Sequence, residues 1–157
     1  MGMSKADARD LIEQYFKSFN QGDFEQTASL FAQAGQLTPP FEGMVIGPET
    51  IFHYLQKKAE NMEAMPTQWT LHLDESGQWR VDVAGKVKAI VFQVNVTWQF
   101  TVTQNSVTEN QEIEAAQIKL VASPQELLNL KSAKEDSEKT IAENAAVEGR
   151  VAEKEAA

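Results

Sequence analysis

The chain has 157 residues, 42% of them apolar, and carries a formal net charge of −9, which allows one domain with a sizeable core. The acidic balance argues against binding nucleic acid and against docking on anionic membranes, because both surfaces would repel it. The absence of cysteine from the sequence excludes disulfides, zinc thiolate sites and cysteine nucleophiles.

The N-terminal segment is predicted to form two helices. It begins MGMSKADARD, without the apolar core of a signal peptide, and no apolar run could span a bilayer, so we expect a cytoplasmic protein without stable membrane insertion. Apolar residues then recur at spacings of three and four over residues 5–19, which is typical of an amphipathic helix. Asp23 is a candidate N-cap for a second helix. Its expected inner face is Phe24, Thr27, Leu30 and Phe31.

A stretch rich in proline and glycine follows, QLTPPFEGMVIGPETI at 36–51. It reads as a connector between helices, yet it contains Phe41, Met44 and Ile46. A solvated connector would not favour such large apolar side chains. These residues are therefore candidates for a second role, either in the core or at a binding site.

The end of this stretch is typical of a helix start. Gly47-Pro48-Glu49 places proline in the first turn, and we expect the helix to run from about residue 48 to residue 63, where Pro66 ends it. The residues that it should bury are Ile51, Phe52, Leu55 and Met62.

After Pro66 the apolar period changes to two, which predicts several strands. Two runs, from Trp69 and from Trp79, flank the turn sequence DESGQ, and Gly85 marks a bulge or bend. The next run has one dry face. That face is Phe92, Val94, Val96, Trp98, Phe100 and Val102. The segment IEAAQIKLVA predicts a last strand, and Ser123-Pro124 a short helix.

Helices followed by antiparallel strands predict an α+β fold, in which a curved antiparallel sheet wraps around the long N-terminal helix. Such a cone commonly leaves an apolar cavity between helix and sheet, where ligand sites tend to form. Residues 132–157 form an acidic tail rich in Ala, Glu and Lys, which we expect to be disordered or weakly helical.

The sequence offers little for catalysis or metal binding. His53 and His72 fall at expected surface positions, Asp82 is a lone acid on a strand, and no metal-ligand spacing or phosphate-binding glycine loop occurs. Tyr15 and Trp98 lie on predicted buried faces, and buried donors normally need partners. They donate either to backbone carbonyls in an ordinary core or to a bound ligand.

Several segments together resemble a known family. QYFKSFNQGDFEQTASLF, LTPPFEGMVIGPETI, GKV, VNVTWQF and LVASPQELLNL occur in this order between about Ala8 and Leu130. They resemble the C-terminal domain of the cyanobacterial orange carotenoid protein and its stand-alone homologues. This resemblance implies the nuclear transport factor two-like cone for residues 1–131.

The resemblance also implies a site and a function. In that family one end ring of a keto-carotenoid, of canthaxanthin or echinenone type, lies in the cone, and its carbonyl accepts hydrogen bonds from residues that match Tyr15 and Trp98. Non-catalytic carotenoid binding and transfer, related to photoprotection, would follow. The implied partners are a second copy of the chain when loaded and a helical carotenoid protein. Candidates for the pocket wall are Phe41, Met44, Ile46, Met62, Met65, Phe92 and Val96, each equally interpretable as core packing.

Two departures from the family pattern leave alternatives open. Lys57-Lys58 stands where an acidic pair is usual, and Val91 where a tryptophan is usual. A homologue that binds another apolar ligand or a protein partner is one alternative. An isomerase or dehydratase of the same fold is another, in which Tyr15 would polarise a substrate carbonyl and Asp82 or His72 would move a proton.

Overall fold

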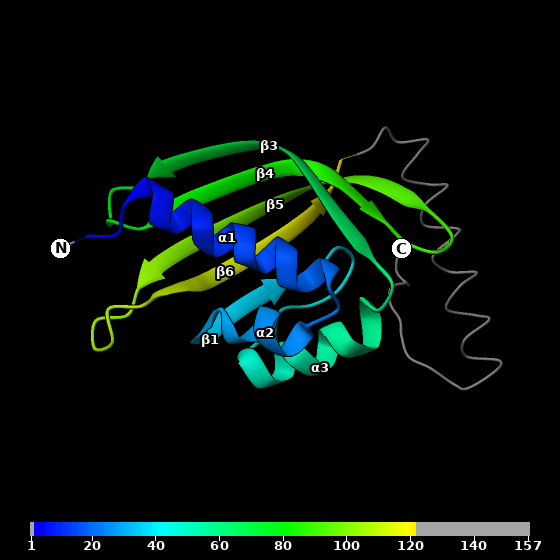
Figure 1. Cartoon of the computed structure of the whole chain (residues 1–157), viewed down its shortest axis with the longest axis horizontal. Helices are drawn as coiled ribbons and strands as arrows, with labels where there is room; N and C mark the ends of the chain where they lie inside the picture. Colours follow the sequence, from blue (N-terminus) through cyan, green and yellow to red (C-terminus); the bar gives the residue numbers. More distant parts are fainter. Residues whose placement is uncertain (1, 122–157) are drawn as a thin grey trace.

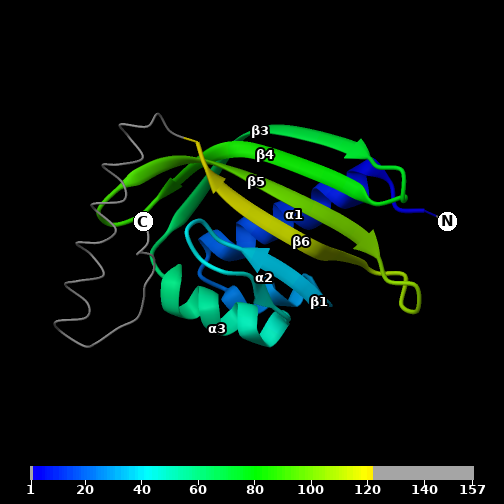
Figure 2. The same ribbon diagram turned by 180° about the vertical axis from the view of Figure 1, so that it is seen from behind.

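The structure, a computed structural model, describes residues 2–121. Its elements are α1 (Lys5–Asn20), α2 (Phe24–Ser29), β1 (Phe31–Thr38), β2 (Val45–Ile46), α3 (Pro48–Lys58), β3 (Glu63–Leu73), β4 (Trp79–Lys88), β5 (Gln93–Gln104) and β6 (Gln111–Leu120). A curved sheet covers α1, and α2 and α3 lie beside β1 (Figures 1 and 2). This confirms the predicted α+β fold. The expected helix after Ser123 and the expected tail lie outside the described residues.

The sheet has six strands in the order β2-β1-β6-β5-β4-β3. Strands β3 to β6 pair antiparallel as predicted, but β1 pairs parallel with β6. The sheet is therefore mixed, and the prediction of a purely antiparallel sheet is wrong. Strand β1 itself was not predicted, because Phe31 was assigned to the second helix. That helix ends at Ser29, and the partner of β1 is far along the sequence, where no local period can reveal it.

Two glycines allow the backbone to approach closely where the pairing is irregular. A Cβ on Gly85 would lie 2.2 Å from the Met65 carbonyl oxygen, opposite the register shift in β3, which confirms the predicted bulge. A Cβ on Gly35 would lie 2.9 Å from the carbonyl oxygens of Ala32 and Ile113. Since these are backbone atoms, neither position has room for a side chain.

The predicted helix starts are confirmed, but one predicted helix end is wrong. Asp23 caps α2 through the amide of Gln26 at 3.2 Å, and α3 begins at Pro48. However, α3 ends at Lys58 instead of residue 63. A turn follows, and β3 already begins at Glu63. Pro66 lies within β3, an edge strand, where its missing N–H is tolerated.

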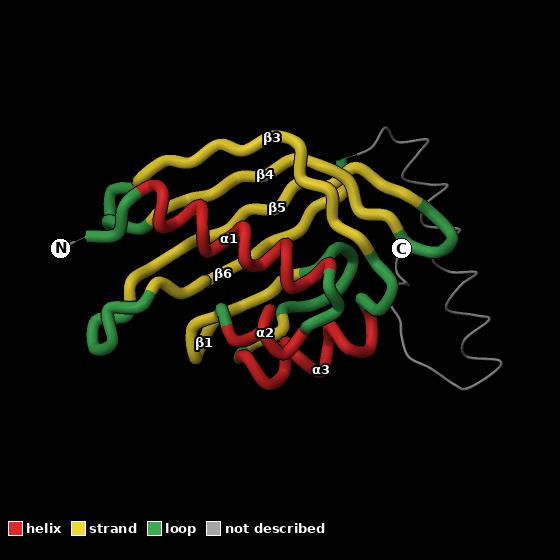
Figure 3. The backbone as a smooth tube through the Cα atoms, in the orientation of Figure 1, coloured by secondary structure: helices red, strands yellow, loops and turns green. Residues whose placement is uncertain are grey.

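Helix α1 runs along the concave face of the sheet (Figure 3), and the buried side chains of the core come from this helix and from that face. The predicted apolar stripe of α1 is buried, and so are Ile51 and Leu55 of α3, whereas Phe52 and Met62 are only partly buried. The predicted dry face of β5 is also confirmed: Val96, Trp98, Phe100 and Val102 are buried, and Val94 is partly buried.

Candidate functional site

Tyr15 of α1 and Trp98 of β5 lie in an aromatic cluster at the centre of the core. Their exposed fractions are 1% and 2%. The ring of Phe16 lies edge-on to both, with centroid distances of 5.3 Å to Tyr15 and 4.9 Å to Trp98. Phe100 lies 5.0 Å from the Tyr15 ring. The fold therefore brings the two predicted donors to within one intervening ring of each other.

The polar tips of these two side chains are not satisfied by the described part of the protein. Within residues 2–121, neither the Tyr15 hydroxyl nor the Trp98 indole N–H makes a hydrogen bond. By contrast, the indole N–H of Trp79 donates to the Met3 carbonyl at 2.9 Å. Burial raises the pKa of the Tyr15 hydroxyl well above its ordinary value, so the group remains a protonated donor. Buried donors without partners are rare in ordinary cores.

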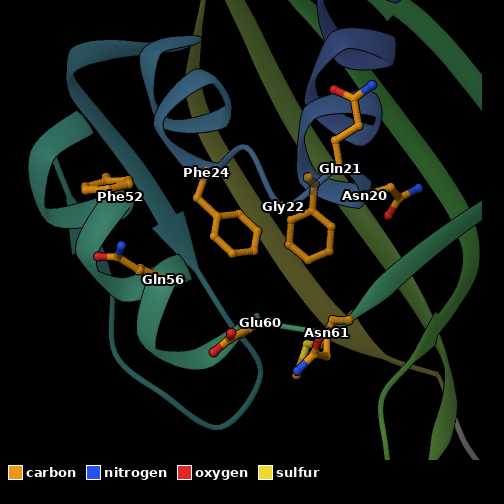
Figure 4. A pocket seen from close by; sticks show the side chains of 10 residues that line it. Asn20, Gln21, Gly22, Phe24, Phe52, Gln56, Glu60 and Asn61 are labelled. Carbon is orange, nitrogen blue, oxygen red and sulfur yellow. The ribbon is translucent and has the colours of Figure 1, made fainter.

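A cavity of about 560 Å³ opens at the C-terminal end of α1 (Figure 4). Apolar side chains from four places in the chain line it, together with a polar rim. The lining residues are Phe19, Phe24, Phe52 and Met62, and Asn20, Gln21, Gly22, Gln56, Glu60 and Asn61. Phe19 also stacks on Tyr15, with centroids 6.1 Å apart and planes 15° apart. One ring therefore connects the cavity wall to the buried donor.

The rim of this cavity is fixed by a pair of hydrogen bonds between α1 and β3. The Asn20 amide nitrogen donates to the Ala64 carbonyl at 2.9 Å, and its amide oxygen accepts from the Ala64 N–H at 2.7 Å. Two turns complete the rim, with positive φ at Gly22 and at Asn61. The side chain of Asn20 thus pairs with β3 as an adjacent strand would.

Three other predicted wall residues lie at the surface, in the segment between β1 and α3. Phe41, Met44 and Ile46 are exposed by 39%, 53% and 52%, so ordinary core packing, the alternative interpretation, does not hold for them. The loop that carries Phe41 is tied to α3, because the Tyr54 hydroxyl donates to Glu42 at 3.3 Å.

The remaining candidates lie at three different depths. Met62 lines the cavity. Met65 of β3 and Phe92, which precedes β5, are half-buried. Val96 is buried two residues before Trp98. The nine predicted residues therefore occupy the core, the cavity rim and the surface, and Met62 is the one of them that lines the cavity at the end of α1.

The candidate proton carriers lie away from Tyr15. His53 and His72 are exposed, and Asp82 pairs with Thr70 and Gln99 on the face of the sheet opposite to the buried Val81 and Val83. Among residues 2–121, no group of His, Cys, Asp or Glu is arranged to hold a metal ion. The chemistry that the aromatic cluster supports is hydrogen-bond donation by two buried neutral groups to an acceptor atom.

Sequence reasoning did not find most of the cavity. Phe19, Phe24 and Phe52 were assigned to core faces, and Asn20 lies where the apolar pattern of the first helix is interrupted. The signal was the polar NQGD segment at 20–23, whose Gly22 turns the chain so that α1 ends and α2 begins at the cavity. The second turn of the rim, which follows Lys58, was missed because the third helix was predicted to continue to residue 63.

No protein-family model matches the chain. One curated relative, the orange carotenoid-binding protein of Limnospira maxima, is 34% identical over 123 residues, which make up 76% of this chain and 37% of that protein. The chain is a homologue of part of the orange carotenoid-binding protein. The resemblance to its C-terminal domain, predicted from the motifs, is confirmed.

Solved structures agree with this relationship. The canthaxanthin-binding orange carotenoid protein of Anabaena (Nostoc) sp. PCC 7120 matches 82% of this chain with a TM-score of 0.64 and 27% identity, over 40% of its own length. Nuclear transport factor 2 of Cryptosporidium parvum matches 74% of this chain and 93% of its own, with a TM-score of 0.64 and 14% identity. This second match confirms the fold alone. Within residues 2–121, no helix combines the length and apolar character needed to cross a bilayer.

Proposed function

We propose that this chain is a non-catalytic keto-carotenoid-binding protein, in which Tyr15 and Trp98 donate hydrogen bonds to the carbonyl of one end ring. The observation that carries the proposal is the pair of deeply buried donors without partners among the described residues. Its second support is the relationship to orange carotenoid proteins, one of which is described as binding canthaxanthin. The chain spans only about two fifths of such a protein.

The two donors match the chemistry of a keto group. A carbonyl oxygen has two lone pairs, and two neutral donors can occupy both. Each bond contributes about 0.5–1.5 kcal/mol net, whereas a buried donor left without a partner costs about 1–3 kcal/mol. Most of the affinity would come from burial of the apolar ring and polyene. Polarisation of the carbonyl would shift the pigment absorption to the red.

A transfer role follows from the size of such a ligand. A carotenoid is about as long as a small domain is wide, so one cone covers only part of it. We therefore propose that two copies of the chain share one pigment, and that a helical carotenoid protein receives or supplies it. The ligand class is a canthaxanthin-like or echinenone-like keto-carotenoid, and the proposed location is the cytoplasm.

The same-fold isomerase or dehydratase is the weaker candidate. It needs a base beside the carbonyl that Tyr15 would polarise. His72 is exposed, and Asp82 lies on the opposite face of the sheet from Tyr15. Neither group can therefore reach a substrate that contacts the Tyr15 hydroxyl.

Coexpression with a canthaxanthin pathway tests the proposal. The purified wild type should be coloured and red-shifted relative to free pigment, and Tyr15→Phe and Trp98→Phe should each lose part of that shift. Tyr54→Phe and Trp79→Phe are matched controls, because their polar tips contact Glu42 and Met3, and they should keep the shift. A colourless wild type, or donor variants with an unchanged spectrum, would contradict the proposal.

A further inference from the structure

The turn between β4 and β5 carries two exposed aliphatic residues at its tip. Lys88 pairs with Gln93, and the Ala89 N–H donates to the Phe92 carbonyl at 2.8 Å, so Ile90 and Val91 alone form the loop. They are 81% and 63% exposed. The hairpin thus presents two adjacent large apolar side chains to the solvent.

Ile90 and Val91 are unfavourable residue types for the turn that they form. Tight hairpin turns favour Gly, Asn and Asp, while β-branched residues favour strands. The β3–β4 turn of the same sheet follows the rule: Asp74 accepts from the Ser76 and Gln78 amides, and Gly77 has a φ of 89°. Ile90 and Val91 are unfavourable both in a tight turn and in contact with water, which indicates that they have a role other than folding.

Three exposed lysines lie behind this tip, on the sheet face away from α1. Exposed Lys86 and Lys88 precede the tip on β4, and exposed Lys119 of β6 lies across from Thr97 of β5. Val121, 50% exposed, donates its amide to Asn95, the partner of Lys86. We call Lys86, Lys88, Ile90, Val91, Lys119 and Val121 the hairpin end.

The charge of the hairpin end is opposite to that of the whole chain. Its three lysines have no ion pair within residues 2–121. The acids of the neighbouring strands on this face are Glu63, opposite Lys88, and, further along the strands, Asp82 and Glu112. The net charge of −9 predicts repulsion from anionic surfaces. However, salt screens charges that are more than about 10 Å away, so the nearby lysines determine the attraction of the hairpin end to such a surface.

The hairpin end lies next to the cavity. Glu60, Asn61 and Met62 form part of the cavity lining, and Glu63, the next residue, pairs with Lys88 at the base of the hairpin. A surface held by the hairpin end would therefore be close to the cavity rim. This placement suits a protein that takes an apolar ligand from that surface.

We infer that the hairpin end docks on an anionic lipid bilayer, with Ile90 and Val91 inserted below the headgroups and the three lysines facing lipid phosphates. A projecting tip with two aliphatic side chains and three lysines on one adjoining sheet face fits the headgroup boundary of a bilayer, where apolar burial and charge attraction act together. The purpose of this docking, uptake of pigment, rests on the proposed function, but the docking itself does not require pigment.

Vesicle sedimentation with the full pigment-free chain tests the inference. The wild type should bind phosphatidylcholine vesicles that contain phosphatidylglycerol, more strongly at low salt than at high salt, and bind pure phosphatidylcholine weakly. Lys86→Gln/Lys88→Gln should weaken binding roughly 25-fold, and Ile90→Ser/Val91→Ser about tenfold. The control is Val107→Ser, because Val107 is 87% exposed in the β5–β6 turn at the other end of the sheet, and this variant should bind as the wild type does.

Each contrary outcome has a separate meaning. The inference would be overturned if the wild type did not bind anionic vesicles, or if the hairpin variants bound them as strongly as Val107→Ser does. If ultracentrifugation shows that the Ile90→Ser/Val91→Ser variant loses a dimer while its vesicle binding is unchanged, the hairpin end is a contact between copies instead. Two further measurements separate this inference from the proposed function. The hairpin variants should take up canthaxanthin from detergent with a normal spectrum. Tyr15→Phe and Trp98→Phe should still bind vesicles.

Discussion

The ring of Phe19 lies almost parallel to the ring of Tyr15, and the same Phe19 side chain forms part of the cavity wall. It also contacts Phe24, another wall residue, at a centroid distance of 5.7 Å. The Phe19 ring thus contacts both the cavity and the Tyr15 ring, and we expect a guest in the cavity to approach Tyr15 past it.

We therefore predict that Phe19→Leu speeds pigment loading. The smaller side chain should open the wall beside Tyr15 while it costs about 1 kcal/mol of stability. The rate of the spectral red shift after mixing with canthaxanthin measures this effect. Phe31→Leu is the control, because Phe31 contacts Tyr15 at 6.3 Å without lining the cavity. Equal rates in the two variants would show that Phe19 does not limit access.

Removal of the Tyr15 hydroxyl should not destabilise the pigment-free protein. A buried hydroxyl without a partner costs free energy, so Tyr15→Phe is expected to leave the free energy of unfolding unchanged or to raise it by about 1 kcal/mol. Urea unfolding at neutral pH measures it, with Tyr54→Phe as the variant that loses a real hydrogen bond. A clear loss of stability in Tyr15→Phe would mean that the hydroxyl has a partner.

Alkaline pH should destabilise the protein partly through Tyr15. Burial holds the pKa of its hydroxyl above the ordinary value of about 10, so the unfolded chain loses this proton at a lower pH than the folded protein. Below about pH 10 the phenol is neutral in both states and the free energy of unfolding is unaffected by its ionisation. As the pH rises further, the phenol ionises first in the unfolded chain, and the free energy of unfolding falls. Urea unfolding above this pH should therefore show a smaller loss in Tyr15→Phe than in Tyr54→Phe. An identical loss would contradict the prediction.

The Asn20 side chain is expected to hold the cavity rim together. Asn20→Ala removes both hydrogen bonds to Ala64 and should lower the free energy of unfolding by about 1–3 kcal/mol. Amide hydrogen exchange at Ala64 should also become faster. Gln21→Ala, which changes a neighbouring rim residue, provides the comparison and should leave the exchange at Ala64 as it is in the wild type.

Gly85 should tolerate no side chain. In Gly85→Ala the new Cβ would collide with the Met65 carbonyl oxygen, and separating β3 from β4 there should cost about 3 kcal/mol. Gly43→Ala is the matched control, since a Cβ at Gly43 meets nothing within 4 Å, and its effect should stay within about 0.5 kcal/mol. Thermal unfolding of both variants checks this, and similar melting temperatures would refute it.

Local periodicity explains what could be predicted of the fold. The apolar stripe around Tyr15 and the apolar alternation around Trp98 each lie within one continuous segment. Helix α1, strand β5 and their buried faces can therefore be predicted from the sequence. Strand β1 could not be found in this way, because its parallel partner β6 is distant in sequence. The end of α3 was also missed, since the residues after Lys58 carry no strong breaker before Pro66.

The candidate site was predictable to a smaller extent. Burial of Tyr15 and Trp98 follows from their positions on apolar faces, but whether a buried donor has a partner depends on neighbours from other elements. The cavity forms where the turn at Gly22 meets the turn at Asn61, and neither segment alone indicates it. Exposure of Phe41 and Ile90 likewise depends on what the fold leaves uncovered.

The parallel pairing of β1 with β6 also affects how the chain is made. Strand β1 is synthesised early and its short neighbour β2 follows at once, but its other neighbour in the sheet, β6, is the last strand of the described chain. During translation, Phe31 and Leu37 must therefore wait until β6 leaves the ribosome before the sheet can cover them. Slow translation through residues 39–110 would prolong the time for which this apolar strand is open to chaperones or to aggregation.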